Sequence, residues 1–307
     1  MDRNVSFRKG SKAYALLSTP PVVDKGKDAS DVAVFIPVYD WIGWKKENDV
    51  PSGTYYLRHA LWARYFIYKW TDALTENVRV YLFTTPDIVD RNKTILRKSG
   101  VSVDADICFI QEKDRFPEEG KFHVKLLAFD NPFIQRHEIA WIMDADCFVT
   151  QPDSGEISPI FQKIKGLDRT GIYSRCAGPE PFWEKIYRFI ENLHNPKETN
   201  SQNRERWKEI AKHLTNYRMD DMLLRAHGSN LLVFPKSYEY SKFVDSLNEL
   251  KYKVLEQHDE IVIGLSILCK NIVLNDLRPI FKSCHLKINH GPVLIAEETD
   301  FYEKSND

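Results

Sequence analysis

The stretch EIAWIMDADCFVTQPD, residues 138–153, decides the fold class of this chain. Its apolar residues 139–143 form a continuous run bounded by polar residues, which is typical of a parallel strand covered on both faces. Asp144 and Asp146 follow at once and place two carboxylates, one residue apart, at the carboxyl end of that strand. In open α/β sheets ligands bind outside the carboxyl ends of the strands, so the two acids mark a candidate ligand site.

The chemistry of the two carboxylates indicates a hard divalent cation. Mg²⁺ and Mn²⁺ are usually held by one or two carboxylates together with the phosphates of a substrate. Asp-x-Asp triplets are also common on solvated loops and at helix starts. This triplet, however, follows an apolar run and leads into Cys147, Phe148 and Val149, and charges in a buried stretch need a partner. We therefore interpret Asp144 and Asp146 as part of a metal–diphosphate site, as a user of nucleotide sugars needs.

The composition argues against several kinds of partner. The 307 residues carry 43 basic and 44 acidic side chains, and the basic residues are scattered rather than gathered in a stripe. Nucleic-acid-binding domains usually present a basic face, so we expect no nucleic acid partner. The five cysteines include no CxxC pair, which is typical of a protein from a reducing compartment.

The sequence predicts no membrane segment. Spanning a membrane takes a run of about 18 or more apolar residues, and the chain has none. Its first residues, MDRNVSFRKGSKAYALL, lack the apolar core of a signal peptide. We therefore expect a cytoplasmic protein of bacterial or viral type. The sequence gives no indication of an oligomeric state.

Apolar runs alternate with amphipathic segments along most of the chain. This alternation, with right-handed crossovers, predicts an α/β fold with a doubly wound and mostly parallel central sheet flanked by helices. Besides residues 139–143, the expected strands are 32–38, 78–85, 101–110, 170–174, 229–234 and 271–277. The expected helices are 54–74, 86–98, 122–129, 237–250 and 259–269, with two more within 181–214.

We expect one catalytic domain. Residues 1–30 are polar with weak periodicity and form a lead-in, and residues 31–307 form the domain. Within it, residues 31–175 are assigned to the nucleotide sugar and the metal, and residues 176–307 to the acceptor. No flexible linker separates the two halves.

The order of several motifs resembles a known family. KLLAF (125–129), IAWIMDADCFV (139–149), SNLLVF (229–234), DEIVIGL (259–265) and NHG (289–291) follow one another as in glycosyltransferases of the GT-A fold. The resemblance is closest to the glycogenin and lipopolysaccharide-galactosyltransferase type and spans residues 30–292. It implies a Rossmann-like GT-A domain that moves a hexose from a UDP-sugar to a saccharide or glycan acceptor with retention of configuration.

The resemblance also implies a metal site. Asp144 lies towards the ribose and bridges to the metal, Asp146 coordinates the metal directly, and His290 completes the site beside the diphosphate. An imidazole with two carboxylates suits Mn²⁺ better than Mg²⁺ and leaves positions open for phosphate oxygens. Ala145 and Gly291 belong to the same two motifs and are expected to contact the donor. A histidine before a glycine is also common in a plain turn.

A basic residue is implied near the diphosphate. Lys125 falls where family members place a cation that reaches the diphosphate or the first aspartate, and such a cation would stabilise the charge that develops on the leaving UDP. Lys121 is a near alternative. Either lysine also fits a solvated position on a helix.

The end of the first strand is expected to hold the nucleoside. Pro37, Val38, Tyr39 and Asp40 lie where the family cradles uracil and ribose. Tyr39 is placed to stack on the base, and Asp40 to accept a hydrogen bond from a ring N–H or a hydroxyl. The same four residues also fit a simple exit from strand to loop.

Asp259 and Glu260 are the candidates for the catalytic step. As adjacent helical residues they point about 100° apart, so they serve different tasks. In a retaining enzyme the leaving phosphate itself can deprotonate the acceptor. An inverting enzyme needs a general base instead, from these residues or from Asp220 and Asp221, which also fit a helix start.

The sequence departs from the family at three places that concern the sugar. Gly228-Ser229-Asn230 replaces an Asn-x-Gly turn, His258-Asp259-Glu260 stands where an Asp-Gln pair is usual, and Pro292-Val293 where a lysine is usual. Sugar identity and stereochemical course therefore carry over less well than the fold.

Two other functions fit parts of the sequence. A sugar-nucleotidyltransferase shares a related sheet and a need for Mg²⁺, but PVYDWIGWKKE (37–47) matches its glycine-rich phosphate loop weakly, with a single glycine. A non-catalytic glycan- or nucleotide-binding protein is the other alternative, and the presence of Asp144, Asp146 and His290 argues against it.

Overall fold

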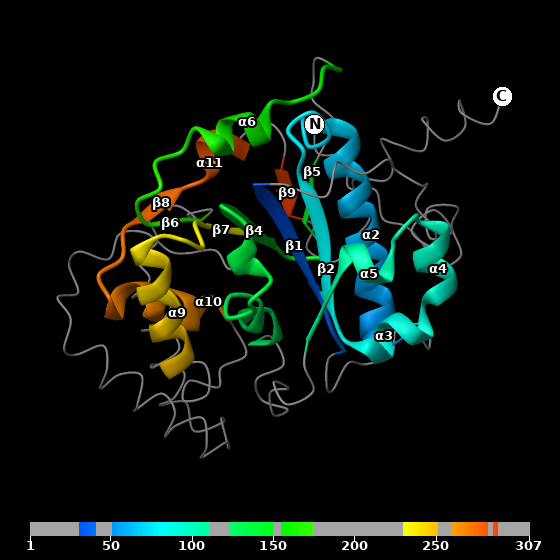
Figure 1. Cartoon of the computed structure of the whole chain (residues 1–307), viewed down its shortest axis with the longest axis horizontal. Coiled ribbons are helices and arrows are strands. Elements are labelled where there is room, and N and C mark those ends of the chain that lie inside the picture. Colours follow the sequence, from blue (N-terminus) through cyan, green and yellow to red (C-terminus); the bar gives the residue numbers. More distant parts are fainter. Residues whose placement is uncertain are drawn as a thin grey trace, which may run out of the picture. The chain divides into compact units, whose positions relative to one another are not determined.

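The computed structural model describes residues 31–40, 51–110, 123–145, 147–149, 155–174, 230–250, 259–281 and 285–287 (Figure 1). The expected lead-in over residues 1–30 and the two helices expected within 181–214 lie outside these ranges. Among the described residues, no helix has the length and apolar character needed to cross a membrane.

Seven of the described strands form one sheet, in the order β3-β2-β1-β4-β7-β6-β8. Strand β1 pairs with β2, β2 with β3 and β6 with β8 in parallel, whereas β6 and β7 are antiparallel. The predicted α/β class with a mostly parallel central sheet is therefore confirmed. The strands are β1 Val32–Val38, β2 Arg79–Thr84, β3 Ile107–Phe109, β4 Ile139–Met143, β6 Ile172–Ser174, β7 Asn230–Val233 and β8 Leu274–Asp276.

The continuous apolar runs in the sequence correspond to strands that are buried along their whole length. Every residue of β1, β2 and β4 is buried. Covered on both faces, such strands show no alternation of polar and apolar residues. The register of β1 on β2 runs from Ala33 opposite Arg79 to Val38 opposite Thr84, so both strands end at the same edge.

A second sheet consists of two short strands. Strand β5 (Cys147–Val149) pairs antiparallel with β9 (His285–Lys287), and Cys147 lies opposite Lys287 (Figure 1). The sequence pattern assigned no element to residues 284–293, so β9 is a finding of the structure, and residues 288–293 lie outside the described ranges.

The chain divides into two compact units, each described here by itself. The first comprises residues 1–113, 142–167 and 280–307, and the second comprises residues 114–141 and 168–279. The single catalytic domain over 31–307 stays a prediction. The helices are α2 Ser52–Trp70, α3 Pro86–Arg91, α4 Lys93–Lys98, α5 Val103–Asp106, η4 His123–Ala128, η5 Ile134–Arg136, α6 Ile160–Lys165, α9 Tyr238–Leu250, α10 Asp259–Cys269 and α11 Arg278–Phe281, of which η4 and η5 are 3₁₀ helices.

Helix α2 ends earlier than its amphipathic pattern suggests. The pattern predicts a helix to residue 74, but Thr71 has an extended backbone (φ −121°, ψ 168°) and its hydroxyl donates to the carbonyl of Ile67. The next residue, Asp72, accepts from the backbone N–H groups of Phe161 and Gln162, each at 2.8 Å. Asp72 thereby caps the first turn of α6, whose N–H groups have no partner within the helix.

Two predicted elements are wrong in detail. The helix expected over 86–98 is broken into α3 and α4 at Asn92, whose side chain donates to the carbonyl of Ile88 at 2.7 Å and to the hydroxyl of Thr54 at 3.1 Å. The strand expected over 101–110 begins only at Ile107, because residues 103–106 form α5. The alternation of VSVDA (101–105) is typical of a strand. In the structure, however, the Asp106 carboxylate accepts from the N–H of Ser102 at 2.9 Å and closes a helical turn.

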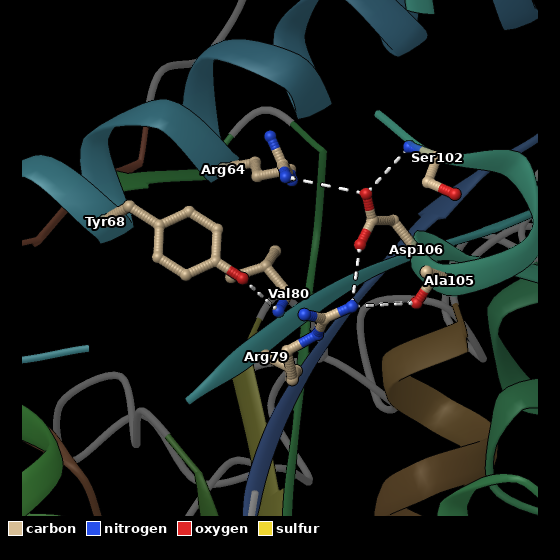
Figure 2. Close-up of polar contacts among 7 residues, drawn as sticks. All are labelled: Arg64, Tyr68, Arg79, Val80, Ser102, Ala105 and Asp106. Carbon is tan, nitrogen blue, oxygen red and sulfur yellow. Dashed lines mark hydrogen bonds and ion pairs between the residues drawn. The ribbon is translucent and has the colours of Figure 1, made fainter. Parts of the chain in front are cut away.

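Asp106 is also the centre of a buried charge cluster made of Arg64, Arg79 and Asp106 (Figure 2). Relative exposure is 2% for Arg64, 4% for Arg79 and 1% for Asp106. Arg79 donates to an Asp106 oxygen at 3.1 Å and to the carbonyl of Ala105 at 3.2 Å. Arg64 approaches the other oxygen only to 3.6 Å, and burial lowers the pKa of its guanidinium. Two cations therefore share one carboxylate.

The second unit is held together around Phe129 and β7. The hydroxyl of Tyr240, on α9, donates to the carbonyl of Phe129, and burial raises the pKa of this tyrosine. The ring of Phe129 meets Phe243 edge to face with centroids 5.3 Å apart. The indole of Trp141 donates to the side-chain oxygen of Asn230 at 3.2 Å, so β4 and β7 share a buried polar contact. These contacts fix the 3₁₀ helix η4, which precedes Phe129, against α9.

Candidate active site

Asp144 lies directly after the last residue of β4, Met143. Its side chain is half-buried, and Ala145 next to it is 6% exposed. The carbonyl of Asp144 accepts from the N–H of Cys147 at 3.0 Å, so a tight turn begins at Asp144 and leads into β5. The expected placement of the first aspartate at a strand's carboxyl end is therefore correct. Asp146 lies outside the described residues.

The pairing of β5 with β9 bears on the expected third ligand. Because the strands are antiparallel and Cys147 lies opposite Lys287, the start of β5 and the end of β9 are neighbours. Asp146 immediately precedes β5, and His290 follows β9 by three residues. In sequence, both motifs therefore adjoin the same end of this small sheet.

The full metal set stays a prediction. Among the described residues there is no group of three or more histidine, cysteine, aspartate or glutamate side chains able to hold a metal ion. Asp146, His290 and Gly291 belong to the segments outside those ranges. The described backbone is compatible with this donor set, because the start of β5 and the end of β9, which the two motifs adjoin in sequence, are neighbours.

Asp40, two residues after the end of β1, contacts two helices. One carboxylate oxygen accepts from the backbone N–H of Gly53, at the start of α2, at 2.8 Å, and the other pairs with Arg91 on α3 at 2.5 Å. The contacts of Gly53 and Arg91 with Asp40 were not predicted from the sequence, although a glycine at a helix start allows such a close approach. Of the other residues expected at the nucleoside, Val38 is fully buried and Tyr39 is half-buried. Contacts of Pro37, Val38, Tyr39 and Asp40 with a donor stay predictions.

Replacing Gly53 with alanine should disturb this arrangement. An added Cβ would lie 2.6 Å from Cδ1 of Ile88 and 2.7 Å from Oδ1 of Asp40, so both side chains must move. Overpacking of this kind costs about 1–3 kcal/mol, and we expect a loss of stability in that range in urea unfolding. Nucleotide affinity should fall as well if Asp40 is part of that site.

Gly166 provides a matched control. A Cβ there would meet nothing closer than the Lys163 carbonyl at 3.5 Å, an ordinary contact. Gly166→Ala should leave stability unchanged or raise it by about 0.4–1 kcal/mol, because alanine restricts the unfolded chain. Equal effects of the two substitutions would contradict the steric account.

Lys125 and Asp259 form an ion pair in the second unit. Lys125 lies on η4 and is 5% exposed, and Asp259 is the first residue of α10 and is 8% exposed. Nζ of Lys125 contacts Oδ2 of Asp259. The structure therefore brings together two residues that the sequence nominated separately, one for the diphosphate and one for catalysis. Their pairing was not foreseen, since nothing local in the sequence connects them.

The remaining nominated residues are described only in part or not at all. Glu260 is the second residue of α10, and its side chain lies outside what the structure describes. Lys121, Asp220 and Asp221 also lie outside the described ranges. Their expected roles stay predictions.

Comparisons with solved structures find proteins similar to this chain at low identity. The mannosyltransferase Ktr4p from S. cerevisiae has 11% identity and a TM-score of 0.40, over 83% of this chain and 73% of that one. Mouse xyloside xylosyltransferase 1 has 12% identity and a TM-score of 0.45, over 80% and 84%. The galactosyltransferase LgtC, solved with donor and acceptor sugar analogs, has 12% identity and a TM-score of 0.40, over 80% and 74%.

No protein-family model matches this sequence, and comparison with curated proteins finds no match. Because the identities and TM-scores to solved structures are low, function has to be inferred from the residues of this chain.

Proposed function

We propose that this chain is a metal-dependent glycosyltransferase that moves a hexose from a UDP-sugar to a saccharide or glycan acceptor. The observation that carries the proposal is the turn that begins at Asp144 and leads into β5, together with the pairing of β5 with β9. The pair of aspartates precedes β5 and the histidine motif follows β9, so in sequence both adjoin the same end of this small sheet. Such a donor set suits a divalent cation that carries a diphosphate.

The expected ligands are Asp144, Asp146 and His290, and Mn²⁺ is the favoured ion. When bound, the ion would neutralise charge on the leaving diphosphate. The protein's own contribution is to hold the ligands. Every residue of β4 is buried, so Asp144 extends from a strand with little freedom to move, and fixed ligands cost little reorganisation during the reaction.

The end of β1 is proposed to receive the nucleoside. Both oxygens of Asp40 have partners within the protein, Gly53 and Arg91. A carboxylate has acceptor capacity beyond these two contacts, so Asp40 is proposed to accept from a ring N–H or a hydroxyl of the donor, and Tyr39, which precedes it, to stack on the base. The neighbouring Pro37 and Val38, with Ala145 and Gly291, complete the proposed donor contacts.

Asp259 and Glu260 are proposed to serve the transfer step, with retention of configuration. Asp259 starts α10, where the positive end of the helix dipole favours a carboxylate. A negative charge held in a fixed place can stabilise an oxocarbenium-like centre. Comparing the anomeric configuration of donor and product distinguishes this course from inversion.

The test is release of UDP from a panel of UDP-sugars with Mn²⁺, with Mg²⁺ or with EDTA, for the wild type and for Asp146→Asn. We expect slow hydrolysis of one donor in Mn²⁺, and its loss with EDTA and with the substitution. Asp104→Asn is the matched control, because Asp104 is an exposed aspartate on α5 and should be neutral. Absence of binding and turnover with every UDP-sugar would contradict the proposal, and preferential turnover of a nucleoside triphosphate would indicate a nucleotidyltransferase.

A further inference from the structure

The charge of Lys125 is already matched within the protein. Its ammonium contacts the carboxylate of Asp259, and the two side chains are only 6% and 11% exposed. A lysine that stabilises a leaving diphosphate needs an ammonium directed at the phosphate oxygens. Here the ammonium is directed at a carboxylate, in surroundings where an unpaired charge would be costly.

The pair also fixes one oxygen of Asp259 in particular. Oδ2 is buried and faces Lys125, so the exposed part of the side chain lies elsewhere on the residue. Lys125 therefore contacts Oδ2 and orients the carboxylate plane. Without the lysine, the carboxylate would lose the contact that fixes its orientation.

The element that carries Lys125 is rigid. The residues after it, Leu126 to Phe129, are all buried, and α9 holds them through the hydroxyl of Tyr240 and the ring of Phe243. The Lys125–Asp259 contact then connects this fixed segment to the first residue of α10. Three elements of the second unit thus converge on the position of one carboxylate.

We propose that Lys125 is a positioning residue that acts through Asp259, holding its carboxylate oriented at the start of α10, rather than a cation that binds the diphosphate. The inference rests on the proposed function and deepens it. It assigns Lys125 and Asp259 a single joint task in place of two independent ones. Removing either partner should therefore have nearly the same consequence.

The experiment compares Lys125→Met, Asp259→Asn and the double variant with the wild type. Two quantities are measured, the affinity for UDP with Mn²⁺ by titration calorimetry and kcat for the best donor. We expect UDP affinity to stay within about twofold and kcat to fall by about 100-fold in each single variant, as misplacement of a reacting group does. The double variant should be no worse than the singles, because residues that act as a unit are not additive. Lys125→Arg, which keeps the charge, should recover part of kcat.

Lys165→Met is the matched control, because it removes a lysine from another ion pair, Lys165–Glu76 in the first unit, and should leave kcat unchanged. A tenfold or greater loss of UDP affinity in Lys125→Met, or kcat losses that multiply in the double variant, would overturn the proposal. The unfolding temperatures of the wild type, Lys125→Met, Asp259→Asn and the double variant provide a readout that needs no activity. If the wild type shows no turnover but the two substitutions have non-additive effects on the unfolding temperature, the proposed function is contradicted and the Lys125–Asp259 pair is kept. If their effects on the unfolding temperature are additive, the pair itself is contradicted.

Discussion

Replacing Asp144 with asparagine is expected to lower the rate of UDP release in Mn²⁺ by about 100-fold to 1,000-fold, because a metal ion contributes several kcal/mol of charge stabilisation in the transition state. The substitution keeps the shape of the side chain and removes its charge. Asp144 follows the buried strand β4 and begins the turn into β5, so its position is set by backbone contacts that an asparagine can also keep. The loss should therefore come from the metal and not from the fold.

Two measurements separate these causes. Mn²⁺ affinity, from calorimetry in the presence of UDP, should fall together with the rate, and raising the Mn²⁺ concentration should restore part of it. The unfolding temperature of Asp144→Asn in EDTA should be close to that of the wild type in EDTA. An Asp144→Asn protein that keeps both the wild-type rate and the wild-type Mn²⁺ affinity would exclude this aspartate from the metal site.

Replacing Asp106 with alanine is expected to reduce the free energy of unfolding by about 3–5 kcal/mol, the usual cost of removing one partner from a buried ion pair. The loss leaves Arg64 and Arg79 buried side by side without their shared carboxylate. It also removes the acceptor for the N–H of Ser102, and with it the closure of α5. Urea unfolding followed by circular dichroism measures the change.

Arg64→Met is the informative counterpart. Nε of Arg64 has no hydrogen-bond partner within the described part of the chain, and its nearest contact with Asp106 is the longer of the two ion pairs. Methionine keeps much of the buried apolar contact and leaves one cation for one carboxylate. The free energy of unfolding of Arg64→Met should therefore be close to that of the wild type, since replacing a buried charge with an apolar group is often neutral or stabilising. A loss as large as that of Asp106→Ala would show that Arg64, too, is required for the cluster.

The elements that the sequence predicted well are those whose pattern is set by burial alone. Strands β1 and β4 coincide with apolar runs, and α10 coincides with the predicted helix 259–269, because these segments are covered on all or most of their surface. The position of Asp144 followed from the same reasoning, since the apolar run that forms β4 ends at Met143.

The errors arose where a distant residue changed the local preference. Residues 101–110 alternate like a strand, but the charge of Asp106 is buried against arginines from α2 and β2, and α5 forms around it. Asn92 divides a predicted helix because its side chain reaches across to Thr54. The partners of Asp40 and the pairing of Lys125 with Asp259 depend on contacts between distant segments, which periodicity and spacing do not encode.

The two-stranded sheet of β5 and β9 also has a consequence for synthesis. Strand β5 is made near the middle of the chain and β9 near its end, and contacts between segments so far apart form late. The emerging polypeptide would have both aspartates long before it had the histidine motif that follows β9. In a polypeptide made only as far as β5, the proposed metal site would therefore lack its histidine.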